Sequence, residues 1–180
     1  MALTFSGWLA MLNNFAIERA SFSGVEIGML QSLREVPGFL AFTAVFLLLV
    51  ISEQTLALVA LCLMSIGVAL TGLFPFEIGL YATTVLMSVG FHYFETVNNS
   101  LSLQWLSRAE APAMLGKLIA VRSVASLATY AVIWLFFSVL MVTYASAYLM
   151  IGSVGFVLFL WLWLAFPKLA RQSNNTRSSF

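Results

Sequence analysis

The chain has 180 residues, of which 62% are hydrophobic and only 8% are charged, and its formal net charge is +1. Soluble domains carry about 25% charged residues, so this composition excludes an ordinary water-facing surface and indicates that lipid is the main solvent. The small net charge gives no support for a nucleic-acid partner, and we expect none. The single cysteine, Cys62, excludes an intrachain disulfide.

Six apolar segments follow one another along the chain, joined by short links. They are too long for barrel strands and lack dyad alternation, so helix is the structure that can satisfy their backbone groups in lipid. Short links indicate antiparallel neighbours. We therefore expect an all-α integral membrane protein in which residues 1–167 form a bundle of six transmembrane helices. The predicted helices are residues 1–17, 27–50, 55–74, 78–104, 114–139 and 145–166.

The first segment is shorter than the roughly 20 residues that a spanning helix needs. It is therefore expected either to fit by tilting or by local thinning of the bilayer, or to be the later part of a longer helix. Beyond Pro167 the sequence turns polar and loses its periodicity. We expect residues 168–180 to form a disordered basic tail.

Positive charges gather at one end of the predicted bundle. By the positive-inside rule, the link between the fourth and fifth helices and both chain termini are cytoplasmic. The predicted location is the cell inner membrane, which the chain crosses several times. The basic residues at the cytoplasmic end are Arg108, Lys117, Lys168, Arg171 and Arg177, whereas Arg19 stands alone at the opposite end.

Two groups of polar side chains interrupt the apolar segments, and the first lies in the first two predicted helices. Gln31, Arg34 and Glu35 occur at positions i, i+3 and i+4, which places them on one helix face. That face is expected to point inward, because lipid would leave the two charges unpaired. Asn13 and Asn14 lie at a similar depth. The resulting polar layer is either part of a solute pathway or a structural clamp between helices.

The second group lies in the fourth predicted helix and the helix that follows. Ser88, His92, Glu95 and Asn99 share a helix face. Glu95 and Arg122 each lie about ten residues from the cytoplasmic ends of their antiparallel helices, so a rise of 1.5 Å per residue brings them to one depth. We therefore expect a contact between Glu95 and Arg122.

The ionisable side chains of this second group have two interpretations each. Pairing with Arg122 would keep Glu95 charged, whereas burial alone would favour a protonated form that can carry a proton; the alternative is a static bridge between helices. His92, one turn from Glu95, is a candidate proton relay. Its alternative is a hydrogen bond to a backbone carbonyl.

The sequence gives no support for an enzyme, a cofactor or a metal site. His92 is the only histidine, and His92 with Glu95 would supply too few ligands for a metal ion. The sequence contains no HExxH, GxSxG or phosphate-binding glycine loop. We expect no catalytic residues, and an intramembrane enzyme is the weakest of the functional hypotheses.

The overall layout resembles the N-terminal half of a bacterial major facilitator superfamily transporter, which has six helices and cytoplasmic termini. Residues 8–42, WLAMLNNFAIERASFSGVEIGMLQSLREVPGFLAF, resemble the first helix hairpin of some members. Residues 106–126, LSRAEAPAMLGKLIAVRSVAS, resemble their link between the fourth and fifth helices, with Arg108, Pro112 and Gly116 spaced as in that link. The resemblance implies a midplane cavity, a small solute and a second six-helix half, which would be another copy or another chain.

The sequence also departs from that family. Where many members carry a Gly-x-x-x-Asp-Arg-x-Gly-Arg/Lys loop, this chain reads LLVISEQTLAL. The fourth helix lacks the arginine that many members have, and the fifth lacks the Gly-Pro motif of drug/proton antiporters. The sequence therefore does not support an antiporter mechanism.

These observations predict one half, or a fragment, of a secondary active transporter that moves a small polar or amphipathic solute by alternating access, with a proton as the candidate coupling ion. The alternative is a membrane assembly partner or an inactive truncated product, in which the same polar groups only hold helices together. The predicted solute and proton pathway is Asn13, Asn14, Gln31, Arg34, Glu35, His92, Glu95, Asn99 and Arg122.

Overall fold

The computed structural model describes residues 1–106 and 111–165, and all regular structure in these two ranges is helical. The prediction of an all-α chain is therefore confirmed for them. Arg108 and the predicted tail at residues 168–180 lie outside the described residues. The helices are α1 (Ala2–Ala20), α2 (Gly24–Phe39), a 3-10 helix η1 (Leu40–Thr43), α3 (Ala44–Leu48), α4 (Glu53–Thr71), α5 (Glu77–Trp105), α6 (Ala111–Ser138) and α7 (Tyr144–Ala165).

The described helices form six continuous segments, because α2, η1 and α3 follow one another without a gap. These segments correspond one to one to the six predicted ranges, and their ends differ from the prediction by three residues or fewer. The second segment is not a single α-helix, however. Pro37 lies inside α2 and cannot donate a backbone hydrogen bond, and the helix tightens into η1 three residues later.

Three of the described helices, α4, α6 and α7, are long and apolar enough to cross a membrane. The break after Phe39 leaves α2 with only 16 residues. The helices α1 and α5 carry polar side chains in their interiors, which lower their hydropathy. Length and composition thus favour three of the six predicted spans, and the other three remain predictions.

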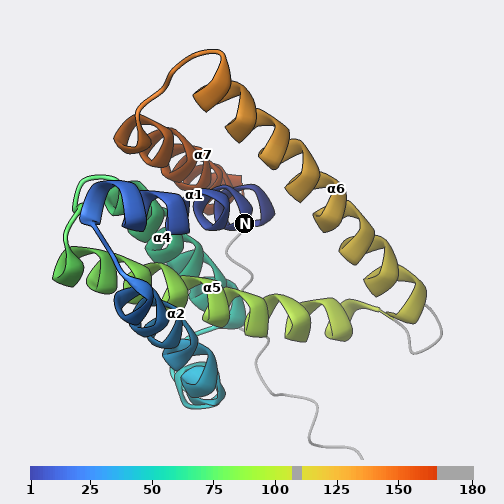
Figure 1. Ribbon diagram of the computed structural model, residues 1–180. Helices are drawn as coiled ribbons and strands as arrows, with labels where there is room; N and C mark the ends of the chain where they lie inside the picture. Colours follow the sequence, from blue (N-terminus) through green and yellow to red (C-terminus); the bar gives the residue numbers. More distant parts are fainter. Residues whose placement is uncertain (107–110, 166–180) are drawn as a thin grey trace, which may run out of the picture.

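Helix α4 lies at the centre of the bundle (Figure 1) and packs along α5 on one side and along α7 on the other. Small residues permit this close approach. A Cβ atom added to Gly90 of α5 would lie 2.7 Å from the Cα of Met64, and one added to Gly152 of α7 would lie 2.7 Å from the Cα of Ala69. The two outer pairs are α2 against α5 and α6 against α1, and α1 also packs against α7.

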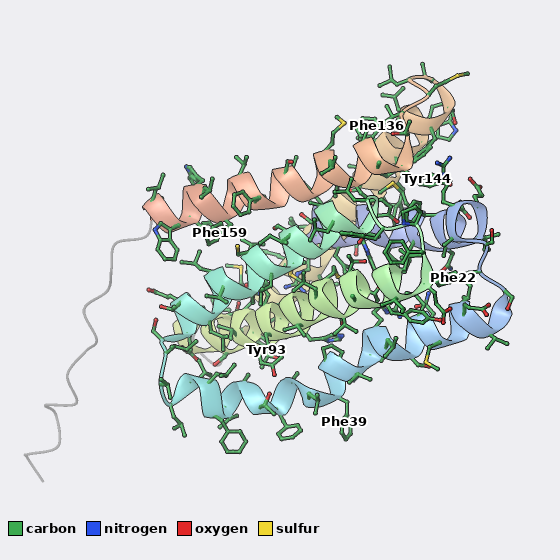
Figure 2. The ribbon with its side chains drawn as sticks, turned by 90° about the vertical axis from the view of Figure 1, so that its left-hand side faces the viewer. Phe22, Phe39, Tyr93, Phe136, Tyr144 and Phe159 are labelled. Atoms are coloured by element: carbon green, nitrogen blue, oxygen red, sulfur yellow. The ribbon has the colours of Figure 1, made fainter. Side chains whose placement is uncertain are left out.

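The main core lies where α1, α4, α5 and α7 meet. Trp8 of α1 is fully buried there, and its indole N–H donates a hydrogen bond of 3.1 Å to the Thr71 hydroxyl of α4. A smaller core joins α3, α4 and α5 around Val97. Figure 2 shows Tyr93 on the side of α5 that faces the second helical segment, where its hydroxyl pairs with that of Thr43. The same view shows Phe39, which is 82% exposed, pointing away from the bundle.

Helix α6 is the least buried of the described helices that could span a membrane. Of its side chains only Thr129 and Ile133 are buried, both in its second half, where it packs against α1. Near the middle of α6, Ser126 shares a hydrogen bond of 2.7 Å with Ser6 of α1. The first half of α6 diverges from α5 (Figure 1), and a polar cleft opens between these two helices.

Candidate functional site: the cleft between α5 and α6

The predicted polar face of α5, here called the polar stripe, consists of Ser88, His92, Glu95 and Asn99. Its members face two different neighbouring helices. Ser88 is fully buried and donates a hydrogen bond to the backbone carbonyl of Arg34 in α2. His92 packs against α2 as well, because a Cβ atom added to Gly38 would lie 2.7 Å from the Cε1 atom of its ring. The next two members, Glu95 and Asn99, line the cleft towards α6. The stripe therefore joins α2 at its first half and reaches α6 at its second half.

The predicted contact between Glu95 and Arg122 is confirmed. The Arg122 Nη1 atom donates to the Glu95 Oε1 atom at 2.5 Å. The pair is accessible, since the Glu95 side chain is 28% exposed and that of Arg122 is 37% exposed. It bridges α5 and α6 at a level where the described parts of these helices share few other contacts.

The cleft has a volume of about 480 Å³ and combines polar and aliphatic walls. This volume is in the range of ligand pockets, which commonly set a few polar groups in an apolar lining. An ion pair beside side-chain amides can orient a small polar group, and the aliphatic wall can hold an apolar one. The described residues that line the cleft are Glu95, Asn98, Asn99, Leu115, Leu118, Ile119 and Arg122.

Four of these residues were not among the predicted pathway residues. Leu115, Leu118 and Ile119 precede Arg122 at positions that place all four on one face of α6. Counting back from Arg122 at helical spacing would have found them. Asn98 lies next to Asn99 in the chain, but the predicted face of α5 included only Asn99.

The polar layer predicted in the first two helices is divided into two separate pairs. The side-chain amide of Gln31 donates to the Asn13 oxygen at 3.1 Å, which joins α2 to α1. Arg34 donates from both Nε and Nη2 to the Glu35 Oε1 atom, at 3.0 and 2.7 Å. Because this ion pair lies within α2, the predicted clamp between helices is formed by the first pair alone.

The inward direction predicted for this face stays a prediction, and its two charged members differ in exposure. The side chain of Glu35 is 60% exposed, whereas that of Arg34 is 23% exposed. Glu35 has its charged partner on the same helix, because the preceding residue, Arg34, pairs with it. Asn13 and Asn14 are also exposed.

His92 lies between the α2 ion pair and the cleft. Its electrostatic neighbours are Glu35 and Arg34 of α2 and Glu95 of its own helix. Its ring also meets the edge of Phe91 at a centroid distance of 5.0 Å. The backbone of Arg34 is also among its hydrogen-bonding neighbours, as the alternative of a backbone hydrogen bond expects. The role of His92 as a proton relay stays a prediction.

No group of three histidine, cysteine or acidic side chains that could hold a metal ion occurs among residues 1–106 and 111–165. Comparison with protein-family models, with curated proteins and with solved structures finds no match to this chain. The resemblance to the major facilitator superfamily therefore remains a prediction. The function of the cleft is inferred from the side chains that line it.

Proposed function

We propose that this chain is a membrane-embedded, six-helix half of a secondary active transporter, and that it moves a small polar or amphipathic solute by alternating access. The observation that carries the proposal is the Glu95–Arg122 ion pair, which stands in a cleft of about 480 Å³. The chain around it is 62% hydrophobic. Ionisable groups at membrane depth are costly and commonly mark the path of a solute or an ion.

The list of helix pairs in contact supports the proposal, because it is symmetric between the two halves of the bundle. Helix α1 packs against α6 and α7, and α5 packs against α2 and α4. Exchanging the first three long helices (α1, α2, α4) with the last three (α5, α6, α7) maps one set of contacts onto the other. The remaining large contact, α4 against α7, maps onto itself. Repeats of three helices with inverted topology are a feature of each half of major facilitator superfamily transporters.

The exposed surface of α6 fits a lipid environment. Its outward side chains are large and apolar, including Val121, Val124 and Leu127, which are 66%, 66% and 67% exposed. In water such a surface would drive aggregation, whereas hydrocarbon solvates it. The cleft is different, because its charges and amides need polar partners. A facing second half, from another copy or another chain, would enclose it.

The test is uptake by cells or proteoliposomes that contain the full chain, measured over a panel of radiolabelled small polar and amphipathic solutes. Glu95→Gln should lower uptake at least tenfold while membrane insertion and folded yield stay unchanged. Glu18→Gln is the matched control, because Glu18 lies at the far end of α1 and bonds the Tyr144 hydroxyl at 3.0 Å. Its uptake should equal that of the unmodified chain.

The alternative function, an assembly partner that transports nothing, predicts a different pattern. Glu95→Gln and Arg34→Gln would then lower folded yield, and no solute would enter in a Glu95-dependent way. Unchanged uptake by correctly inserted Glu95→Gln would show that Glu95 has no role in transport.

A further inference from the structure

The ion pair in the cleft leaves much of the Arg122 guanidinium unused. A guanidinium has five N–H donors, and two parallel bonds to one carboxylate make the strongest pair. Arg122 makes one contact with Glu95, from Nη1 to Oε1. Arg34, in the same chain, bonds its carboxylate from both Nε and Nη2. No second acceptor for Arg122 occurs among the residues that the structure describes, so it can receive another acceptor group.

The surroundings of Arg122 indicate the shape of a ligand that would bind there. Leu118 and Ile119 lie one turn from Arg122 on the same face of α6, and Leu115 lies two turns away, at about 10 Å. Asn98 and Asn99 stand on the opposite wall. A ligand with a small polar head at Arg122 and an apolar chain of a few carbon atoms would match both walls.

The charge of the ligand follows from what each member of the pair can do. An arginine stays protonated in proteins, whereas a glutamate can become neutral by taking up a proton. A cation that displaced Arg122 from Glu95 would therefore leave the cleft with an added positive charge. An anion that displaced Glu95 from Arg122 would leave it neutral, provided that Glu95 gained one proton. Only the anion can be exchanged without leaving an uncompensated charge in a low-dielectric cleft.

We propose that the cleft binds a small amphipathic carboxylate on Arg122, and that Glu95 takes up one proton from solvent as its own carboxylate leaves the guanidinium. The exchange is balanced: the neutral Glu95–Arg122 pair, one proton and one carboxylate anion give a neutral cleft with protonated Glu95 and a bound anion. This inference rests on the proposed function, whose substrate it names by class.

Other charged groups surround the pair and must be separated from it. On α5, His92 is an electrostatic neighbour of Glu95. His92 also interacts electrostatically with Arg34 and Glu35 of α2. On the α1 side, the amino group of Met1 interacts with Arg122. His92 and the amino group of Met1 could each take up a proton in the pH range of the test, so the test has to distinguish both from Glu95.

The test is equilibrium binding of radiolabelled pentanoate to the full chain in phosphatidylcholine nanodiscs, with empty nanodiscs as the background. Pentylammonium and 1-pentanol, which have the same chain length, should compete at least tenfold more weakly than unlabelled pentanoate. The apparent affinity should be at least tenfold weaker at pH 8 than at pH 6, because one proton binds with each anion. Pentanoate itself stays ionised over this range.

Variants test the two proposed roles separately: anion binding by Arg122 and proton uptake by Glu95. Glu95→Gln removes both the competitor and the proton acceptor, so pentanoate should bind at least tenfold more tightly at pH 8 and without pH dependence. Arg122→Gln should lose binding, and the double variant Glu95→Gln/Arg122→Gln, which leaves no unpaired charge, should fold and also fail to bind. Arg19→Gln is the matched control for the loss of a guanidinium, because Arg19 lies at the exposed end of α1; its binding should not change.

Three results would overturn the inference: equal competition by pentylammonium, weaker binding by Glu95→Gln, or a pH dependence that survives in Glu95→Gln. The last result would place the proton on His92 if His92→Gln then abolished the pH dependence, and on the amino group of Met1 if it did not. Because binding in nanodiscs needs no transport, the failures are distinguishable. Glu95-dependent uptake of another solute without pentanoate binding contradicts this inference alone, and pentanoate binding without any uptake contradicts the transport function alone.

Discussion

At the residue scale, a reciprocal pair of side-chain bonds fixes the start of α2. The Ser23 hydroxyl accepts from the backbone N–H of Val25 at 3.3 Å, and the Glu26 carboxylate accepts from the backbone N–H of Ser23 at 2.8 Å. The Ser23 hydroxyl also donates to Glu26. These bonds satisfy N–H groups that have no partner within the helix. The hydrogen bond from the Ser23 side chain, with those from the backbone, holds the pKa of Glu26 below its ordinary value of 4.5.

This lowered pKa predicts a pH dependence of stability. Because the folded-state pKa lies below the unfolded one, ionised Glu26 stabilises the fold above about pH 4.5, and the stabilisation is lost as the pH falls through the folded value. The melting temperature of the chain should therefore exceed that of Glu26→Gln at pH 7, and the difference should shrink as the pH falls below 4.5. Differential scanning fluorimetry in detergent measures it.

The control for this effect is the same substitution in a chain without the capping serine. In the Ser23→Ala background, Glu26→Gln should change the melting temperature less at pH 7, because the largest cause of the lowered pKa is absent. A difference between the chain and Glu26→Gln that stays constant from pH 7 to pH 3 would contradict the role of the Glu26 charge.

The residue scale also shows which parts of the site could be predicted. The Glu95–Arg122 pair could be, because depth along two antiparallel helices follows from a constant rise per residue. The partner of Arg34 could not be predicted in this way, because the carboxylate of Glu35 on the same helix competes with any partner on another helix. The rotation of α5 that brings Asn98 into the cleft depends on its packing against α4, which no local pattern specifies.

At the element scale, α4 holds the bundle together through close contacts that tolerate no side chain. A Cβ atom added to Gly90 would lie 2.5 Å from the Ala60 carbonyl oxygen and 2.7 Å from the Cα of Met64, so the backbones of α4 and α5 would have to separate. Such overpacking destabilises proteins by about 1–3 kcal/mol. Gly90→Ala should therefore lower the free energy of unfolding by about this amount, measured by denaturant titration in mixed micelles.

Gly116 of α6 provides the matched control for Gly90, because a Cβ added there would meet no atom within 4 Å beyond its own stretch of helix backbone. Alanine favours a helix interior over glycine by about 1 kcal/mol, so Gly116→Ala should leave the stability unchanged or raise it. If both substitutions had the same effect, the close approach of α4 and α5 would not explain the role of Gly90.

The element scale also separates what is local in this fold from what is not. The six helical ranges could be predicted because apolar length is a property of each segment alone. The change to η1 after Phe39 was missed, although Pro37 gave a signal for it. The pairing of helices, with α4 central and α6 at the edge, depends on which small and large side chains meet. Hydropathy alone does not contain that information.

At the scale of the whole molecule, the two kinds of exposed surface have different consequences. Apolar side chains such as Phe39, which points outward in Figure 2, are well solvated by lipid. The cleft is not, because polar groups that face hydrocarbon lose their hydrogen bonds to water. Glu95 and Arg122 satisfy each other only in part, and the amides of Asn98 and Asn99 stand beside them. A single bundle in a bilayer would therefore leave a polar cleft facing lipid.

This imbalance predicts that the chain forms a defined assembly in a membrane. Native mass spectrometry of the chain released from nanodiscs should give the mass of two six-helix bundles, either two copies or one copy with a second chain. Replacing both charges, as in Glu95→Gln/Arg122→Gln, lowers the polarity of the cleft and should increase the monomer fraction, while Glu18→Gln should not. A monomer at every ratio of protein to lipid would contradict the prediction, because a lone bundle would then tolerate its cleft in lipid without a facing half.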